Sequence, residues 1–390
     1  MRPILIVAQK EFMDHLMSKR FIAIFAILML LCIAGIASSM NAYDQSMDAY
    51  KKNQYENPLQ PGFQEQVAGL QKQIMDLQAY GGSADEIQML RQQLELLVNP
   101  PIPSILSVFG MVNNGGSVGG GFFSMMIILI AMALGFDLIT REKEEGSLKS
   151  LLSHPVFRDE VVNGKLLGAV ATLAVVMGIV FIVTVVVMMF YGAMLTTDDL
   201  ARLGAFFILA TLYSSVIFAI SVMFSTICRT SVMSILCVIA IIILFMVVPS
   251  LTPNIASAVL GPTPEMSQIP QYINVIGSEV GGSGANGTQQ VINPAYYQYY
   301  TRQFMLTDTI NTLSPLYSFD SRISAAILFK ESSSTGPVPY SKALTQSPIY
   351  VEPSLWDSLA YAWIDILALI TEFVVFAAIT YVLFMRLDVQ

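Results

Sequence analysis

LLGAVATLAVVMGIVFIVTVVVMMFY, residues Leu166–Tyr191, is a run of 26 residues without one charged side chain. A helix of about 20 apolar residues crosses the roughly 30 Å hydrocarbon core of a bilayer, so this run alone predicts a membrane-spanning helix. The composition agrees, because 12% of the 390 residues are charged and 54% are hydrophobic, whereas ordinary soluble domains are roughly 25% charged. The sequence is that of a membrane protein.

Five further runs are long and apolar enough to cross a membrane: 21–40, 122–139, 203–227, 231–248 and 359–385. We therefore expect an all-α membrane protein with six transmembrane helices. Residues 1–20 precede the first helix, 140–165 join the second to the third, 166–248 hold three helices with short connections, and 386–390 form a tail. The first run is also compatible with a signal peptide, but it follows 20 residues that include Glu11 and Asp14, which favours a retained helix.

Lys and Arg residues give the orientation, because they are concentrated in the cytoplasmic segments of membrane proteins. If the N-terminus is cytoplasmic, the short inner segments hold 11 of the chain's 20 Lys and Arg residues, although the outer segments are several times longer. These are Arg2, Lys10, Lys19, Arg20, Arg141, Lys143, Lys149, Arg158, Lys165, Arg229 and Arg386. We expect a multi-pass protein of the cell membrane with both termini in the cytoplasm, and with 41–121 and 249–358 outside.

The segment before the opening run is unusually charged: DLITREKEEGSLKSLLSHPVFRDEVVNGK, residues Asp137–Lys165, holds 11 charged side chains. Helix-forming residues occupy 141–153, Glu145 and Lys149 are spaced to pair, and Pro155 disfavours continuation of the helix. A second helix is expected beyond the proline and into the opening run. The two helices would project into the cytoplasm, and the simpler alternative is an ordinary charged inner loop.

The N-terminal segment has the pattern of an amphipathic helix over Pro3–Met17. One arc of this helix gathers the apolar residues Leu5, Ile6, Ala8, Phe12, Met13, Leu16 and Met17, and the opposite side carries Lys10, Glu11, Asp14 and His15. Such a helix is expected to lie along the inner membrane interface. The alternative is a disordered basic tail.

Both outer segments contain helical patterns. In the first, apolar residues recur every three or four positions over Phe63–Ala79 and Ala84–Val98, and Tyr80-Gly81-Gly82-Ser83 between them predicts a turn, which together indicate an antiparallel hairpin. Its apolar stripes either pack on each other or bind an extracytoplasmic partner. In the second segment, Pro294–Leu313 and Ser318–Phe329 are expected to be helical, with the latter on the outer membrane face.

Acidic residues inside a membrane span are costly and therefore point to function. Asp365 and Glu372 are seven residues apart in the last run, so they share one helix face. They either bind a cation or polar substrate, or they are carboxylates paired with other helices. Asp137, at the inner end of the second run, is expected to organise the 140–165 segment.

Motifs for catalysis and ligand binding are missing from the sequence. It contains no G-x-x-x-x-G-K-[ST] phosphate loop, and its two histidines, His15 and His154, are too far apart for a His-rich metal site. No basic patch with interleaved aromatic residues suggests a nucleic-acid partner. We expect no catalytic, cofactor or metal site, so energy for work against a gradient must come from a partner or from ions.

Three motifs resemble the ABC type-2 permeases, most closely those related to the nitrous-oxide-reductase maturation permease and to sodium-efflux permeases. They are DLITREKEEGSLK (Asp137–Lys149), LLSHPVFR (Leu151–Arg158) and GKLLG (Gly164–Gly168). The six apolar runs, the N-terminal helix, Leu313-Ser314-Pro315 and the ending FMRLD (Phe384–Asp388) extend the similarity over most of the chain.

The resemblance implies that the 140–165 segment is a coupling helix, seated in a groove of a separate ATPase subunit. The residues at this contact would be Glu142, Glu144, Glu145 and Arg158, within a motif that includes Gly146, Leu148 and Pro155, and with Asp137 and Lys165 in support.

The resemblance further implies that two copies of this chain form a homodimer on two ATPase subunits, which bind the ATP and Mg. The chain itself would be the non-enzymatic permease of an exporter. Because the outer segments are long, the alternative is a mechanotransmitting subunit that acts on an extracytoplasmic partner without transport. An ion-driven carrier that uses Asp365 and Glu372 is a third hypothesis.

Overall fold

In the part of the chain that the structure describes, six helices are long and apolar enough to cross a membrane. The structure, a computed structural model, describes residues 3–56, 60–80, 104–109, 111–113, 116–118, 121–146, 158–261, 272–276, 288–292, 294–328 and 353–386, with isolated helical positions between 87 and 98. The six helices are α2 (Lys19–Lys51), α5 (Gly121–Gly135) with its continuation to Glu144, α8 (Arg158–Phe190), α9 (Thr197–Ile227), α10 (Ser231–Leu260) and α16 (Trp363–Met385). The predicted helical fold with six membrane-spanning helices is confirmed.

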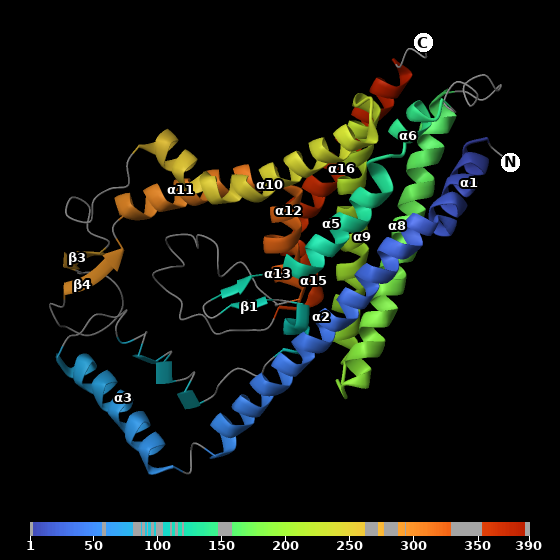
Figure 1. The fold of residues 1–390 in the computed structure, drawn as a ribbon. Coiled ribbons are helices and arrows are strands. Elements are labelled where there is room, and N and C mark those ends of the chain that lie inside the picture. The colour runs from blue at the N-terminus through green and yellow to red at the C-terminus, as the bar shows by residue number, and fades with distance from the viewer. Residues whose placement is uncertain are drawn as a thin grey trace.

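The two ends of the chain lie at the same end of the helix bundle (Figure 1). We call this the terminal end, and the turn after α8 lies at the opposite end. Two helices continue beyond the C-terminal ends of their apolar runs: α2 continues past residue 40 to Lys51, and α10 continues past residue 248 to Leu260, with Pro249 and Pro253 inside it.

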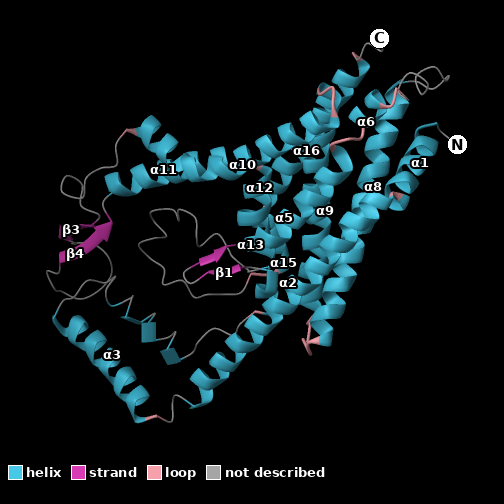
Figure 2. Ribbon diagram, in the orientation of Figure 1, coloured by secondary structure: helices cyan, strands magenta, loops and turns pink. Residues whose placement is uncertain are grey.

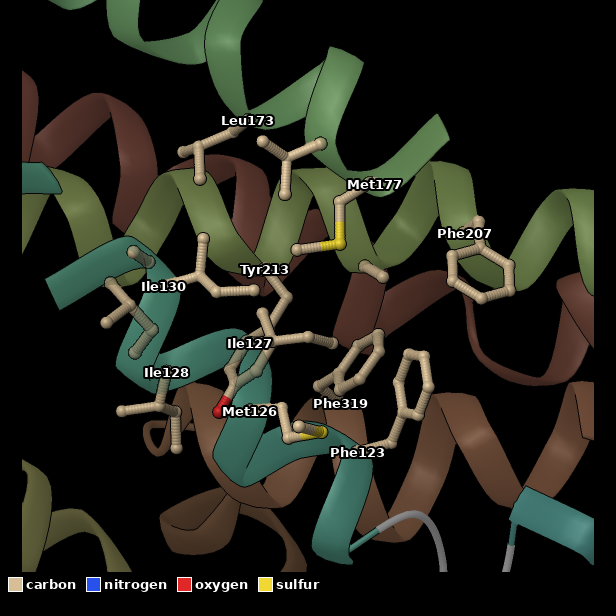
Figure 3. Close-up of a cluster of buried hydrophobic side chains, with 14 of the residues drawn as sticks. Phe123, Met126, Ile127, Ile128, Ile130, Leu173, Met177, Phe207, Tyr213 and Phe319 are labelled. Carbon is tan, nitrogen blue, oxygen red and sulfur yellow. The ribbon is translucent and has the colours of Figure 1, made fainter. Parts of the chain in front are cut away.

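The α9 helix is the centre of the bundle. In its most apolar stretch 78% of the residues are buried, against 17% for α10 and 11% for α16. Phe207 and Tyr213 of α9 pack against Phe123 of α5 and Phe319, respectively (Figure 3). The rings of Tyr213 and Phe319 are stacked, with 4.5 Å between their centroids and 3° between their planes. The neighbouring helices are therefore positioned by their contacts with α9.

The helix α1 (Pro3–Met17) lies against the first turns of α8 at two glycines. A Cβ atom at Gly164 would lie 2.7 Å from Val7 Cβ, and one at Gly168 would lie 2.6 Å from the Ala8 carbonyl oxygen, so neither position has room for a larger side chain. Ala8 and Glu11 are buried on this face, whereas the exposed apolar residues of α1 include Leu5, Ile6, Met13 and Met17. The predicted helix is present, but its contact with α8 includes the polar residue Glu11.

The remaining elements connect the spans (Figure 2). They are the π-helical turn η1 (Lys52–Glu56), α3 (Pro61–Tyr80), the 3₁₀ turn η3 (Ile105–Phe109), α6 (Thr140–Glu144), α11 (Pro294–Asn311), α12 (Pro315–Tyr317), the π-helical turn η4 (Ser318–Ile323), α13 (Ser324–Leu328) and α15 (Leu355–Tyr361). Two short antiparallel ladders that the sequence did not predict join β1 (Met111–Asn113) to β2 (Gly116–Val118) and β3 (Tyr272–Ile276) to β4 (Thr288–Ile292).

The first arm of the predicted outer hairpin is the helix α3, and its predicted apolar stripe is its least exposed face. Ile74 on this stripe is 8% exposed, whereas Met75 beside it is 63% exposed. The second arm, 84–98, lies outside the described residues apart from isolated helical positions.

The continuous turns α12, η4 and α13 cover the predicted helix Ser318–Phe329, but they do not lie on the surface. Phe319, Ile323 and Leu328 are 0% exposed, and η4 packs against α9, α5 and α16. The prediction that this helix lies on the outer membrane face differs from the structure, because a segment with apolar residues on several sides is buried between the spans.

Arg202 fixes this segment to the bundle. Its side chain is 1% exposed, although it carries a full charge, and its guanidinium pairs with Asp198 at 2.8 Å. The same group donates to the carbonyl oxygen of Ile327 at 3.0 Å and to Ser358 Oγ at 3.1 Å. One guanidinium therefore joins α9 to α13 and α15, which satisfies a charge that would otherwise be costly to bury.

Candidate functional site

The charged segment begins with a sharp turn between α5 and α6 that is held by a serine of α9. Ser225 Oγ accepts hydrogen bonds from the backbone N–H groups of Ile139 and Thr140, at 2.9 and 3.0 Å. These are N–H groups at the start of a helix, which have no partner within the helix itself. Ser225 therefore fixes the point at which α6 leaves the bundle.

The α6 helix is shorter than the predicted helix over 141–153. It ends at Glu144, and Gly146 adopts a φ of 68°, a left-handed conformation that ends helices and favours glycine. Glu145 pairs with Arg141 one turn earlier, at 2.8 Å, and its predicted partner Lys149 lies outside the described residues. Residues 147–157, with the predicted coupling residues Leu148 and Pro155, lie outside the described residues.

Lys165 is the centre of a buried ion network that joins three helices at the terminal end. Its Nζ donates to Glu11 Oε1 of α1 at 2.7 Å and to Glu142 Oε1 of α6 at 2.8 Å. The side chains of Lys165, Glu11 and Glu142 are only 4%, 9% and 20% exposed. Glu142, predicted at an ATPase contact, thus points into the bundle and ties α6 to α8 and α1.

Two further side chains of α6 bind the ends of other spans. Lys143 Nζ donates to backbone carbonyl groups at the C-terminal end of α9, including that of Cys228 at 3.1 Å. Glu144 accepts hydrogen bonds from the backbone N–H and the hydroxyl of Ser231 at the start of α10, at 2.8 and 2.9 Å. A cation at a helix C-terminus and an anion at a helix N-terminus are both favourable arrangements. Glu144, which was predicted at the ATPase contact, therefore binds α10 of its own chain.

The side chains of Arg141 in α6 and of Glu145 just after it are exposed, at 55% and 56%, and Glu144 between them is exposed as well. Arg141 and Glu145 border a groove of about 640 Å³ between α1, the start of α2, the end of α5 and α6. Four of the predicted residues come together along this groove: Asp137, Glu142, Glu145 and Lys165. Asp137 also lies 3.9 Å from the guanidinium of Arg20. For Arg158, the structure gives the backbone position at the start of α8.

Three residues that bind this segment were not assigned to a site from the sequence. Glu11, which lines the groove, was placed on the polar side of an interfacial helix. Ser225 and Ser231, which bind α6 and its N-terminal turn, were part of apolar runs. The sequence holds one sign of this role: Glu11 comes four residues after Val7, so it lies on the same face of α1 as the residue that contacts Gly164. Nearby, burial lowers the pKa of His15 below its ordinary value of 6.5, while the negative charge of Glu11 opposes this shift.

The two acidic residues of the last span have different surroundings. Asp365, 2% exposed, pairs with Arg322 of η4 at 3.5 Å, and Arg322 also pairs with Asp308 at 3.5 Å and donates to the hydroxyl of Tyr361 at 3.0 Å. Asp365 is thus a helix-paired carboxylate, which is one of the two interpretations of the sequence. The buried Oε2 of Glu372 has no hydrogen-bond partner among the described residues.

These features define a multi-pass membrane protein in which a charged segment between the second and third spans is bound to the ends of four other helices. The sequence model of the ABC-2 family transporter proteins matches residues 5–389, nearly the whole chain, so the chain belongs to this family. No curated protein matches the chain. The protein is a permease subunit of an ABC transporter, and its family implies that it works in a membrane with an ABC ATPase.

Proposed function

We propose that this chain couples ATP hydrolysis by a separate ATPase subunit to the export of a substrate. In this proposal the terminal end of the bundle lies in the cytoplasm, and two copies of the chain act with two ATPase subunits. The ATPases bind ATP and Mg, and the chain itself is not an enzyme. The absence of a phosphate loop from its sequence and the concentration of Lys and Arg near the terminal end support this arrangement.

One observation carries the proposal: three consecutive residues of α6 bind three different parts of the bundle. Glu142 binds Lys165 of α8, which also binds α1, Lys143 binds the end of α9, and Glu144 binds the start of α10. Because these contacts are short, and those of Glu142 and Lys143 are partly buried, a force applied to α6 would move the attached helix ends together. A segment with these contacts is suited to transmit a movement of the ATPase to the spans.

The contact with the ATPase is proposed to involve the exposed Arg141, Glu145 and Gly146 and the adjoining segment 147–157, in which Leu148 and Pro155 stay predictions. Glu142 and Glu144 would act indirectly, by holding α6 in place. This assignment divides the predicted coupling residues into those that contact the ATPase and those that bind α6 to the other helices.

The test measures ATP hydrolysis by the complex of this chain with its copurifying ATPase in lipid vesicles. Replacing Glu145 by Arg should reduce the stimulated rate about tenfold, equivalent to about 1.4 kcal/mol of contact energy. The exchange Arg141→Glu with Glu145→Arg restores the internal pair but reverses the surface charges, so it should remain impaired. Glu65→Arg on the exposed side of α3 is the control and should hydrolyse ATP normally. Native rates in both Glu145 variants would contradict the proposal.

A second candidate function is mechanotransmission, in which ATPase movements rearrange the outer helices to act on an extracytoplasmic partner. The long helix α3 with its apolar stripe favours it. Deletion of 63–98 separates the two functions, because an exporter should retain ATP-driven flux into vesicles without this segment. Mechanotransmission would be favoured over export by two results together. The native complex would show no flux, and the deletion variant would lose the activity of the partner while its ATP hydrolysis stays unchanged.

A further inference from the structure

Two of the chain's three cysteines are in contact at the junction of α9 and α10. Cys228 directly follows α9, and Cys237 lies in the second turn of α10. The thiol of Cys228 donates a hydrogen bond to Cys237 Sγ, with 4.0 Å between the two sulfur atoms. The third cysteine, Cys32, is buried in α2, and all three are free thiols. The junction therefore holds a pair of thiols, one from each side.

This pair needs only a small movement to form a disulfide. The S–S bond is about 2.05 Å long, so the sulfur atoms would have to approach each other by about 2 Å. Rotation of the side chains about their Cα–Cβ bonds moves a sulfur atom by a distance of this order. A zinc ion, in contrast, takes four ligands, and the described part of the chain has no group of three or more His, Cys, Asp or Glu residues placed for a metal ion. The geometry therefore favours a covalent bond between the two sulfur atoms.

The two thiols differ in their access to a small oxidant. Cys228 is 5% exposed, whereas Cys237 is half-buried. Burial raises the pKa of the Cys228 thiol above its ordinary value, its hydrogen bond to Cys237 acts in the same direction, and the positive charge of Lys143 opposes the shift. Because the thiolate is the form of cysteine that reacts, Cys237 is expected to react first and Cys228 second.

We propose that Cys228 and Cys237 form an oxidation site for hydrogen peroxide, which converts them to an intramolecular disulfide. The Cys237 sulfur attacks one peroxide oxygen, the O–O bond breaks, and the products are a sulfenic acid and a first water. The Cys228 sulfur then attacks the Cys237 sulfur, the S–S bond forms, and the sulfenic hydroxyl leaves with the Cys228 proton as a second water. Two thiols lose two electrons and two protons in total, and a dithiol reductant reverses the reaction by exchange.

The oxidation site lies where α6 binds the spans. Lys143 Nζ donates to the carbonyl oxygen of Cys228 at 3.1 Å, and Glu144 binds the backbone N–H of Ser231, which lies between the two cysteines in the sequence. A disulfide would close a short loop around these contacts and would restrict the movement of α10 relative to α9. In the proposed orientation this end of the bundle faces the cytoplasm, where thiols are kept reduced and the disulfides that form are usually transient and redox-sensing.

Oxidation is therefore expected to slow the ATP hydrolysis that this chain stimulates, because the helix ends bound to α6 could no longer move freely. This consequence rests on the proposed function of the chain in coupling. The oxidation itself does not rest on it, because the reaction needs only the two thiols and peroxide.

The first experiment uses the full chain in nanodiscs, without ATPase or ATP, and treats it with hydrogen peroxide. The remaining thiols are alkylated with N-ethylmaleimide under denaturing conditions, and peptides are mapped by mass spectrometry without reduction. We expect a linked pair of peptides that contain Cys228 and Cys237, an alkylated Cys32, and recovery of both linked thiols with dithiothreitol. Absence of the linked pair, whether Cys237 is oxidised further or does not react, would overturn the proposal.

Single variants test the order of the two steps. Cys228→Ser removes the second thiol, so Cys237 should remain a sulfenic acid that dimedone labels. In Cys237→Ser the buried Cys228 should be oxidised about tenfold more slowly than Cys237 is in the first variant. Cys32→Ser is the control and should form the linked pair at the native rate. Equal dimedone labelling of the first two variants would overturn the assigned order, and the linked pair in the native chain decides the test if either variant does not fold.

The second experiment measures ATP hydrolysis by the complex with the copurifying ATPase in lipid vesicles. Peroxide should slow the Cys32→Ser complex several-fold, dithiothreitol should restore its rate, and the Cys237→Ser complex should keep its own rate in peroxide. An equal loss in both complexes, or a linked pair without any loss, would overturn the effect on coupling. The two proposals fail separately, because the linked pair is measured without ATPase and the Glu145 variants are measured without peroxide.

Discussion

Lys165 shows how one residue can join three elements. Within the GKLLG motif, the flanking glycines allow α1 to approach α8, and the lysine between them then lies among Glu11 and Glu142. In this low-dielectric position the ammonium group is favourable only with both partners in place, because burial of an unpaired charge costs several kcal/mol. The glycines of the motif therefore make room for α1, and its lysine pairs with α1 and α6, which the sequence alone does not reveal.

Replacing Lys165 by Met should destabilise the protein by about 3–5 kcal/mol, since two buried carboxylates lose their shared cation. Thermal or denaturant unfolding of the purified chain in detergent measures this loss. The triple variant Glu11→Gln, Glu142→Gln and Lys165→Met removes the charges together and should recover most of the stability. A single variant as stable as the native chain would show that the network contributes nothing.

At the scale of elements, the contact between α1 and α8 depends on the absence of side chains at Gly164 and Gly168. The same contact brings Glu11 to Lys165 and leaves the apolar arc of α1 exposed, where it can face lipid. The helix α1 is thus bound to the charged segment through Glu11, and its predicted position at the membrane interface stays a prediction. Its position depends on one small surface of α8.

Gly168→Leu should displace α1, because even a Cβ at this position would lie 2.6 Å from the Ala8 carbonyl oxygen. We expect a loss of about 1–3 kcal/mol in stability, the usual effect of overpacking, and faster proteolysis within residues 3–17. The matched control is Gly178→Ala in the same helix, which has open space around it and should be neutral or stabilising by about 1 kcal/mol. Equal protease resistance of the two variants would contradict this contact.

At the scale of the whole molecule, six spans place both termini on one side of the membrane, and the Lys and Arg distribution predicts that this side is the cytoplasm. The proposed functions depend on this orientation, because the ATPase has to meet α6 while α3 and α11 face the other side.

Single cysteines test the orientation in a chain whose Cys32, Cys228 and Cys237 are replaced by Ser. Met194→Cys, in the turn after α8 where the native side chain is 93% exposed, should react with an impermeant maleimide in intact cells. Lys10→Cys on the exposed side of α1 should react only after the membrane is made permeable. The reverse pattern would invert the topology and remove the proposed ATPase contact.

The sequence by itself determined the six spans and the stripe of α3, because the length of an apolar run and its period are local properties. It also located the charged segment before α8. It did not determine which charges of that segment point outward, and the short α6 contradicts the longer helix that residue propensities predicted. Gly146 ends that helix through a backbone conformation that side-chain patterns describe poorly.

Only the tertiary structure decided which groups meet. Glu11 and Lys165 are 154 positions apart, and Arg202 and Ser358 are 156 apart, so their contacts depend on how the helices pack and rotate against each other. The same packing pairs Asp365 with Arg322 and leaves the Oε2 atom of Glu372 without a hydrogen-bond partner among the described residues. In a low-dielectric interior the free energy of a buried charge depends on the partners that other helices supply, so the tertiary structure decides which of these charges stabilise the protein.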